Sequence, residues 1–106
     1  MSPLQRSMAF MREKNYLVEK VEFWNSWSKT RKDLFDILDL LCIDKTGGRT
    51  VGVQVTTMGQ KQPHVRKIKA SKHLPYLLKA GWRIHLHSWR KLKKTGWTVD
   101  IKEFES

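Results

Sequence analysis

The stretch that decides the fold runs from Leu34 to Thr57 and reads LFDILDLLCIDKTGGRTVGVQVTT. Its second part, Val51–Thr57, alternates apolar and polar residues, which is typical of a strand with one buried face. The first part, Leu34–Asp44, is apolar enough for a buried strand or a short helix, and periodicity does not separate the two. Because the intervening Gly47–Gly48 is typical of a tight turn, we predict an antiparallel β-hairpin over residues 38–44 and 50–57.

The register of this hairpin places polar side chains of both strands on one face. A turn centred on Gly47–Gly48 pairs Asp39 with Thr56. Because side chains alternate across a strand, Asp39, Gln54 and Thr56 share that face, and the valines of the second strand point to the core. Asp39 and Gln54 are then diagonal neighbours, close enough for both to touch one ion.

A carboxylate within an apolar strand, with an amide oxygen as its diagonal neighbour, suits a hard cation such as Mg²⁺. The alternative is a strand with one solvated face, whose aspartate, glutamine and threonine side chains contact only water. The residues of the hairpin do not separate these two interpretations by themselves.

The rest of the chain predicts further helices and strands around the hairpin. A helix begins at Ser2–Pro3 and continues to about Lys14, and Tyr16–Trp24 is rich in strand formers. The basic segment Asn25–Lys32 is predicted to be a loop. After the hairpin we predict a basic helix, a second helical segment that ends at a glycine, and two strands: His64–Lys72, the segment from Pro75 to Gly81, Trp82–Trp89 and Gly96–Phe104. The order is helix, three strands, helix and two strands, in one α/β domain over residues 1–106.

Charge is the strongest signal in the composition, since 21 Lys and Arg against 10 Asp and Glu leave a net charge of +11. This excess favours a polyanionic partner, because each phosphate that a protein neutralises releases condensed counterions. A solubilising surface or an acidic protein partner is the alternative. No apolar run suits a membrane span, the N-terminus is too polar for a signal-peptide core, and Cys42 is the single cysteine. We therefore expect a cytoplasmic protein that binds nucleic acid and no membrane.

Several stretches resemble the PD-(D/E)XK nuclease superfamily, and most closely small phage and bacterial proteins related to Holliday-junction resolvases and virus-type repair nucleases. These stretches are VEFWN, RKDLFDILD, GVQVTT, HVRKIKAS and AGWRIHLHSWRK, and the resemblance extends from Ser7 to Glu105. It implies a restriction-endonuclease-like core of helix, three strands, helix and one or two strands, with a mixed sheet. It also implies a DNA endonuclease of repair and recombination, in a bacterium or a phage-infected cell.

Carried over by position, Asp39 matches the metal-binding aspartate of the second core strand. Gln54 stands where the superfamily usually has Glu or Asp, and Thr56 where it usually has the catalytic lysine, although the small group also shows a Gln-x-Thr pattern. Glutamine offers an oxygen without a charge, and threonine cannot replace an ammonium that steadies the developing phosphate charge. The ligands of Mg²⁺ or Mn²⁺ that the resemblance implies are Asp39, Gln54, the Val55 carbonyl and Asp33.

In this superfamily a lysine of the following helix can replace the missing ammonium. Arg66, Lys67 and Lys69 are candidates here, with Arg66 and Lys69 one turn apart on a shared face. The predicted catalytic residues are Asp39, Gln54, Thr56 and Lys69. Among the other acids, Glu22 is either an outer ligand or a partner of the basic loop, Asp36 stands where the resembled group typically has glycine, and Glu13 is a weaker candidate.

Histidines and tryptophans offer further candidates. His85 and His87 share a strand face without a third zinc ligand, so a half-exposed strand is the better interpretation. Trp27, Trp82, Trp89 and Trp97 could stack on unpaired bases. Of these, Trp82 is expected in the core, and Trp89 is expected to be exposed.

The function that these features predict is a metal-dependent endonuclease selective for DNA structure, such as branched or flapped DNA. A homodimer would cut two strands and enlarge a thin core. The alternative is a non-catalytic nucleic-acid-binding module that retains the nuclease fold. The side chains predicted to grip the DNA backbone are Lys29, Arg31, Lys32, Arg66, Lys67, Lys69 and Lys72.

Overall fold

A mixed sheet of five strands, in the order β1-β4-β5-β6-β7, forms the centre of the structure, a computed structural model that describes residues 1–105. The first three strands are antiparallel, β6 lies parallel to β5, and β7 returns antiparallel to β6. The strands are β1 (Tyr16–Lys20), β4 (Leu40–Asp44), β5 (Thr50–Thr57), β6 (Arg83–Leu92) and β7 (Gly96–Phe104). The predicted α/β class with a mixed sheet is confirmed.

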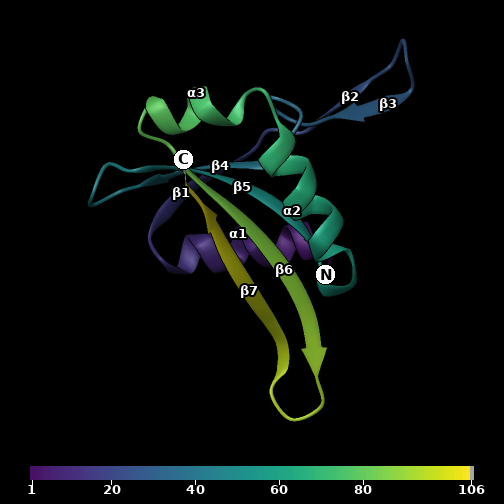
Figure 1. The fold of residues 1–106 in the computed structure, drawn as a ribbon. Helices are drawn as coiled ribbons and strands as arrows, with labels where there is room; N and C mark the ends of the chain where they lie inside the picture. The colour runs from purple at the N-terminus through teal and green to yellow at the C-terminus, as the bar shows by residue number, and fades with distance from the viewer. Residues whose placement is uncertain (106) are drawn as a thin grey trace.

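Helices cover both faces of the sheet (Figure 1). Helix α1 (Pro3–Glu13) lies on one face, and α2 (Lys61–Ala70) and α3 (Leu74–Lys79) lie on the other, after a short 3-10 turn η1 (Met58–Gln60). The parallel step from β5 to β6 requires such a crossover, which α2 and α3 provide. None of the helices within residues 1–105 is long and apolar enough to cross a membrane.

The N-terminal helix begins and ends as its sequence predicts. Ser2 caps it with a reciprocal pair of hydrogen bonds: the Gln5 backbone N–H donates to the Ser2 hydroxyl at 3.2 Å, and the Ser2 N–H donates to the Gln5 side chain at 3.0 Å. Pro3 occupies the first turn, where its missing N–H costs nothing. Asn15 takes a positive φ of 68°, which ends the helix and turns the chain into β1.

The β4–β5 hairpin is confirmed, but its predicted register is wrong by two residues. Cys42 pairs with Val51 and Ile43 with Thr50, which centres the turn one position earlier than Gly47–Gly48. The reason lies in the turn, where Asp44 accepts hydrogen bonds from the backbone N–H and the hydroxyl of Thr46, both at 2.9 Å. Among the turn glycines, only Gly48 takes a positive φ.

The corrected register changes the residue opposite Asp39 but leaves the Asp39 side chain on the predicted face of the sheet. Leu40 pairs with Val53, so one further step along the same register sets Asp39 opposite Gln54 instead of Thr56. The Asp39 N–H donates to the Val53 carbonyl at 2.8 Å, which holds Asp39 at the beginning of β4. A shift of two residues preserves the alternation of side chains, so the shared face survives.

The residues before Asp39 form a tight turn, and not the start of a long strand. Leu34 and Leu38 form an isolated bridge, and between them Phe35 and Asp36 take positive φ values of 52° and 64°. Ile37 and Leu38 are fully buried within this turn. The strand therefore does not extend back to Asp33.

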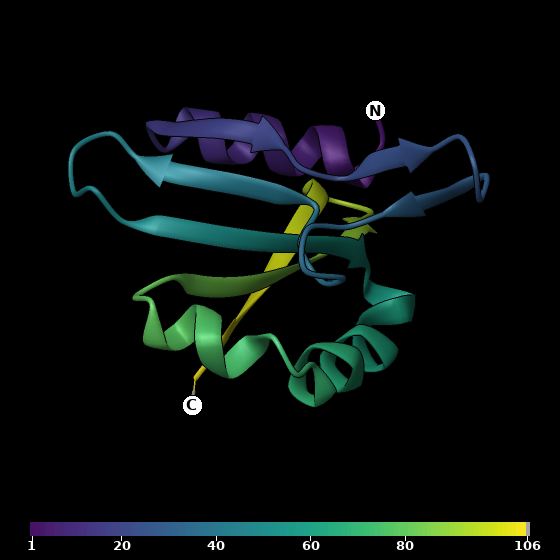
Figure 2. The same cartoon turned by 90° about the horizontal axis from the view of Figure 1, so that it is seen from above.

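A second correction concerns the chain between β1 and β4. The predicted strand Tyr16–Trp24 ends at Lys20, and the predicted loop Asn25–Lys32 contains a strand. Two short strands, β2 (Phe23–Asn25) and β3 (Thr30–Lys32), pair only with each other and form a separate antiparallel ribbon. Figures 1 and 2 show this β2–β3 ribbon extending away from the main sheet.

Two apolar clusters pack on opposite faces of the sheet. The first cluster joins α1 to the sheet and consists of Met11, Val18, Leu40, Cys42, Val51 and Val53. The second joins α2 and α3 to the sheet and consists of Ile37, Leu38, Val65, Ile68, Leu74, Leu77, Ile84, Leu86 and Phe104, with Trp82 packed beside them as expected. Gly52 allows this second cluster to approach β5, because a Cβ there would lie 2.6 Å from Leu38 Cδ1.

The expected exposure of Trp89 and His87 is wrong, because α1 covers this part of β6. Both side chains are buried and meet Ser7. The Trp89 indole N–H donates to the Ser7 hydroxyl at 2.8 Å, and Ser7 Oγ lies 2.9 Å from His87 Nδ1. Burial lowers the pKa of His87 from 6.5 to about 4, so the imidazole is neutral at pH 7.

Candidate metal centre

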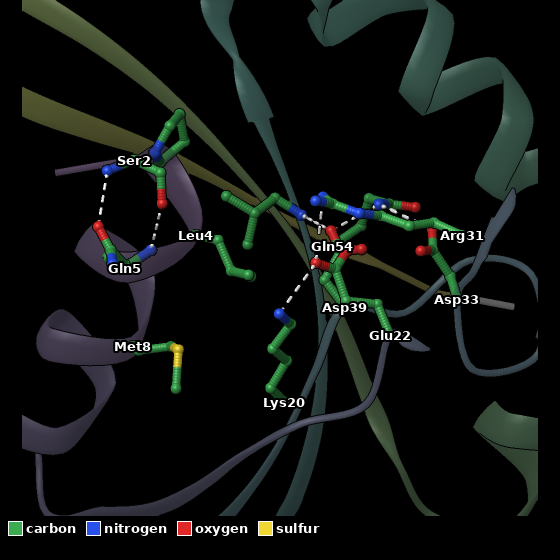
Figure 3. Close-up of a pocket in the computed structure, with 12 residues that line it drawn as sticks. Ser2, Leu4, Gln5, Met8, Lys20, Glu22, Arg31, Asp33, Asp39 and Gln54 are labelled. Carbon is green, nitrogen blue, oxygen red and sulfur yellow. Dashed lines mark hydrogen bonds and ion pairs between the residues drawn. The ribbon is translucent and has the colours of Figure 1, made fainter. Parts of the chain in front are cut away.

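Three carboxylates converge at the point where the β2–β3 ribbon joins the main sheet (Figure 3). Glu22 immediately precedes β2, Asp33 immediately follows β3, and Asp39 immediately precedes β4. One oxygen from each lies within 4.8 Å of the others. Like charges at this distance repel each other unless a proton or a cation compensates them.

Asp39 is the buried member of the three, with 5% of its surface exposed. Its Oδ2 accepts a hydrogen bond from the Gln54 amide at 2.7 Å and another from the Val55 N–H at 2.8 Å. Burial raises the pKa of Asp39 from 3.8 to about 7; the Val55 hydrogen bond opposes this rise, and the negative charge of Asp33 adds to it. A bound cation would reverse the effect by stabilising the ionised form.

Gln54 carries an unused acceptor in this environment. The residue is 3% exposed, and its Nε2 donates to Asp39 and, at 3.5 Å, to Asp33 Oδ2. Its Oε1 is buried and has no hydrogen-bond partner among the described residues. A buried acceptor without a partner costs about 1–3 kcal/mol. Rotation of the amide by half a turn would direct Oε1 toward the carboxylates, where a hard cation could accept it as a ligand.

These donors fit the predicted metal. Mg²⁺ and Mn²⁺ prefer carboxylate and amide oxygens, and the predicted ligands Asp33, Asp39 and Gln54 all supply such oxygens here. Glu22 adds a third carboxylate to the group. The sequence alone allowed two roles for this residue, an outer ligand or a partner of the basic loop. Val55 contacts Asp39 through its backbone N–H, and its carbonyl as a ligand stays a prediction.

A cavity of about 650 Å³ opens beside the carboxylates. Apolar side chains of α1, Leu4 and Met8, form one wall, and the acids with Gln54 form the other (Figure 3). The full lining is Ser2, Pro3, Leu4, Gln5, Met8, Lys20, Glu22, Arg31, Asp33, Asp39, Gln54 and Val55. Thr56 is buried two residues beyond Gln54 and does not line this cavity.

Basic side chains surround the acids. Arg31 lies 3.5 Å and Lys20 3.7 Å from Glu22, so the carboxylate is both a member of the cluster and a partner of the basic ribbon. Lys67 Nζ lies 3.7 Å from Asp33 Oδ2. Lys69, the predicted catalytic lysine, is exposed on α2 and makes no ion pair within residues 1–105.

The remaining candidates lie away from the centre. Asp36 is exposed and lies 3.7 Å from His73, within the Leu34–Leu38 turn. Glu13 is exposed at the end of α1. The sequence did not single out Lys67 above its neighbours. The only feature of the sequence that pointed to Lys67 was its place in the basic run of α2. The contact of Lys67 with Asp33 could not be predicted, because it depends on how the Leu34–Leu38 turn places Asp33 relative to the helix.

No family model matches the chain, and no curated protein or solved structure matches it. Fold and site define a class by geometry: an α/β protein in which the buried Asp39 and Gln54 and two partly buried carboxylates, Glu22 and Asp33, gather beside its mixed sheet. Lys20, Arg31 and Lys67 lie beside this acidic group, in a chain whose net charge is +11.

Proposed function

We propose that the chain is a metal-dependent DNA endonuclease with a restriction-endonuclease-like core. The order α1, β1, β4, β5, α2, β6 supports this, with β6 parallel to β5, because it is the order implied by the sequence resemblance. Relative to that core, the β2–β3 ribbon, α3 and β7 are additions. The membership of the chain in the PD-(D/E)XK superfamily is part of the same proposal.

The observation that carries the proposal is the meeting of three carboxylates with the side-chain amide of Gln54, whose buried Oε1 has no hydrogen-bond partner among the described residues. A buried amide oxygen and clustered acids are costly in the absence of a cation and become favourable ligands in its presence. When bound, Mg²⁺ or Mn²⁺ would activate water and neutralise charge on the scissile phosphate. Asp39 and Asp33 would hold the cation, and the Val55 N–H would fix the orientation of Asp39.

Lys67 is the side chain placed to assume the role of the absent lysine at Thr56. Its ammonium lies 3.7 Å from Asp33 and is half-exposed, so a phosphate approaching the acids would meet it. An ammonium at this position stabilises charge that develops on phosphate oxygens. Lys69, which the sequence predicted for this role, lies in the same helix and stays a prediction.

The substrate we propose is branched or flapped DNA. Phosphate contacts carry no sequence information, so a basic surface favours recognition of shape. The seven predicted contact residues belong to the ribbon and to the α2 region, and all of them are exposed: Lys29, Arg31, Lys32, Arg66, Lys67, Lys69 and Lys72. A homodimer would place two such centres on two strands.

One observation favours the alternative, a nucleic-acid-binding module without catalysis. The Gln54 amide already donates to Asp39, and Lys67 already compensates Asp33, so neutral and cationic groups of the chain itself partly replace a metal. Binding would then persist through the basic surface alone.

A cleavage assay separates the two functions. Wild type, Asp39→Ala and the control Asp36→Ala, which removes an exposed acid outside the site, are incubated with linear, flapped and four-way DNA in Mg²⁺, Mn²⁺ or EDTA. The endonuclease predicts metal-dependent cleavage by wild type and Asp36→Ala, and none by Asp39→Ala with DNA binding retained. If no metal supports cleavage by wild type while binding is intact, the binding module replaces the endonuclease.

A further inference from the structure

The β2–β3 ribbon exposes three large aromatic side chains: Phe23 is 55% exposed, Trp24 61% and Trp27 97%. Two-stranded ribbons are only marginally stable by themselves, and exposed aromatics add nothing to their stability. Single exposed apolar residues are common, but three on one short element mark a surface that contacts a partner.

Each face of the ribbon combines an aromatic ring with a cation. Phe23 pairs with Lys32, and Trp24 pairs with Arg31, so the two pairs project to opposite faces. Residues 23–32 include Lys29 as a third basic side chain and contain no acid. Rings beside cations suit nucleic acid, because bases stack on the rings while the cations contact the phosphates.

The tip of the ribbon holds Trp27 in a defined position. The Asn25 side-chain oxygen accepts hydrogen bonds from the backbone N–H groups of Trp27 at 3.0 Å and Ser28 at 3.3 Å. The Ser28 hydroxyl lies 2.6 Å from the Thr30 hydroxyl, which closes the tip. A preorganised loop loses less entropy on binding than a flexible one. Trp27 is therefore presented outward on a structured support.

The base of the ribbon is the candidate metal centre. Glu22 and Asp33 are the residues that flank the ribbon in sequence, and Arg31 lies 3.5 Å from Glu22. About five residues separate this base from Trp27, which at about 3.3 Å per residue is roughly 17 Å. The same length corresponds to about five nucleotides at about 3.4 Å each.

We propose that the β2–β3 ribbon recognises the branch point of DNA, with Trp27 stacked on an unpaired base at the junction of single and double strands. The ribbon thereby defines the substrate class of the centre at its base. This inference rests on the proposed endonuclease for one consequence only, that cleavage falls within about five nucleotides of the branch. The binding itself requires no catalysis.

The test measures binding in EDTA, where no cleavage occurs. Wild type, Trp27→Ala and Trp27→Phe are titrated with flapped DNA and with duplex DNA of equal length and charge, each carrying 2-aminopurine at the branch position. Tyr76→Ala, which removes another exposed aromatic from α3, is the matched control. We expect Trp27→Ala to lower the affinity for flapped DNA by roughly 5- to 150-fold, the range for loss of one stacked base, and to leave duplex affinity unchanged.

Two further readouts separate stacking from other effects. Wild type and Trp27→Phe should quench 2-aminopurine at the branch, and Trp27→Ala should not. Equal loss of affinity for both DNAs, or no loss for either, would overturn the inference. So would sedimentation in which Trp27→Ala converts a dimer to a monomer, since the ribbon would then contact a second copy.

Failure of the proposed function has a different signature. Wild type that never cleaves in Mg²⁺ or Mn²⁺, yet loses branch preference with Trp27→Ala, would refute the endonuclease and retain the ribbon's role. Wild type that cleaves flapped DNA far from the branch, with unchanged positions in Trp27→Ala, would refute the ribbon's role and retain the endonuclease.

Discussion

The side-chain amide of Gln54 donates a hydrogen bond of 2.7 Å to the carboxylate of Asp39 across the β4–β5 pair. This donor stands where a cation would otherwise balance the carboxylate. The oxygen of the same amide is buried and has no hydrogen-bond partner among the residues that the structure describes. The amide therefore donates to an anion through its nitrogen and retains an unused oxygen that a cation could bind. Replacing the amide by a carboxylate removes the donor and retains an oxygen ligand.

Gln54→Glu should make the centre depend on metal. A further carboxylate beside Asp39 and Asp33 lowers stability in EDTA through like-charge repulsion, and it strengthens Mg²⁺ binding because a charged oxygen is the better hard ligand. Calorimetric metal titration and thermal unfolding with and without Mg²⁺ measure both effects. Gln60→Glu, which makes the same change at an exposed position, should alter neither. Equal and weak binding of Mn²⁺ by wild type, Gln54→Glu and Asp39→Ala would show that these residues form no metal site.

Asp39→Asn should change how stability depends on pH. The pKa of Asp39 rises on folding from 3.8 to about 7, so between these values the folded protein retains a proton that the unfolded chain releases. The contribution of this group is therefore most favourable below its unfolded pKa and is lost as the pH rises to about 7. His87 acts in the opposite direction, because its lowered pKa makes stability rise between about pH 4 and 6.5.

In wild type, the pH dependence of stability due to Asp39 and that due to His87 offset each other, whereas Asp39→Asn retains only the pH dependence due to His87. In EDTA, the unfolding free energy of Asp39→Asn minus that of wild type should rise from about pH 4 to 7, by at most about 1.4 kcal/mol per pH unit. Urea titrations at each pH give this difference. Asp36→Asn, an exposed control that lies 3.7 Å from His73, should change less with pH than Asp39→Asn. A flat difference for Asp39→Asn would mean that Asp39 is ionised throughout this range.

The basic surface of α2 should determine the salt dependence of DNA binding. Replacing Arg66, Lys67 and Lys69 together by Ala should reduce the log–log salt slope by about 0.9 for each phosphate that the variant no longer neutralises. Lys93→Ala with Lys94→Ala, in the β6–β7 turn, is the matched control, and fluorescence anisotropy between about 50 and 300 mM salt measures both. A smaller slope in the turn variant alone would assign the phosphate contacts to that turn.

Asp36→Gly should stabilise the protein by about 0.5–1 kcal/mol. Asp36 holds a φ of 64°, where a Cβ is unfavourable and glycine is not, although glycine loses more entropy on folding. The ion pair with His73 is exposed, so its loss costs little. Thermal unfolding should show a higher Tm for Asp36→Gly and a lower one for Asp36→Val. A lower Tm for both would mean that the side chain contributes more than its backbone conformation costs.

The sequence predicted the β4–β5 hairpin and its polar face because alternation has a period of two. The turn was placed one position too late, and the resulting slip of two residues changed the partner of Asp39 without changing its face. The displacement depends on the Asp44 side chain, which caps the turn at Thr46. Local hydrogen bonds of this kind compete with glycine placement and are difficult to rank from sequence.

Other parts of the site depend on contacts between distant residues. Asp33 reaches the cluster because Phe35 and Asp36 adopt left-handed conformations, which are uncommon for residues other than glycine. This turn also determines that Lys67 meets Asp33. The segment Asn25–Lys32, which contains β3, was predicted as a loop because its composition is polar and basic.

Ser7 has a consequence for the order of events during synthesis. Its hydroxyl joins α1 to His87 and Trp89, which follow 80 and 82 residues later in the chain. A nascent chain on the ribosome can therefore pack α1 against β1, β4 and β5 before β6 emerges, but the contacts of Ser7 form only afterwards. The hydrogen bonds that tie His87 and Trp89 to α1 are therefore among the last to form during synthesis.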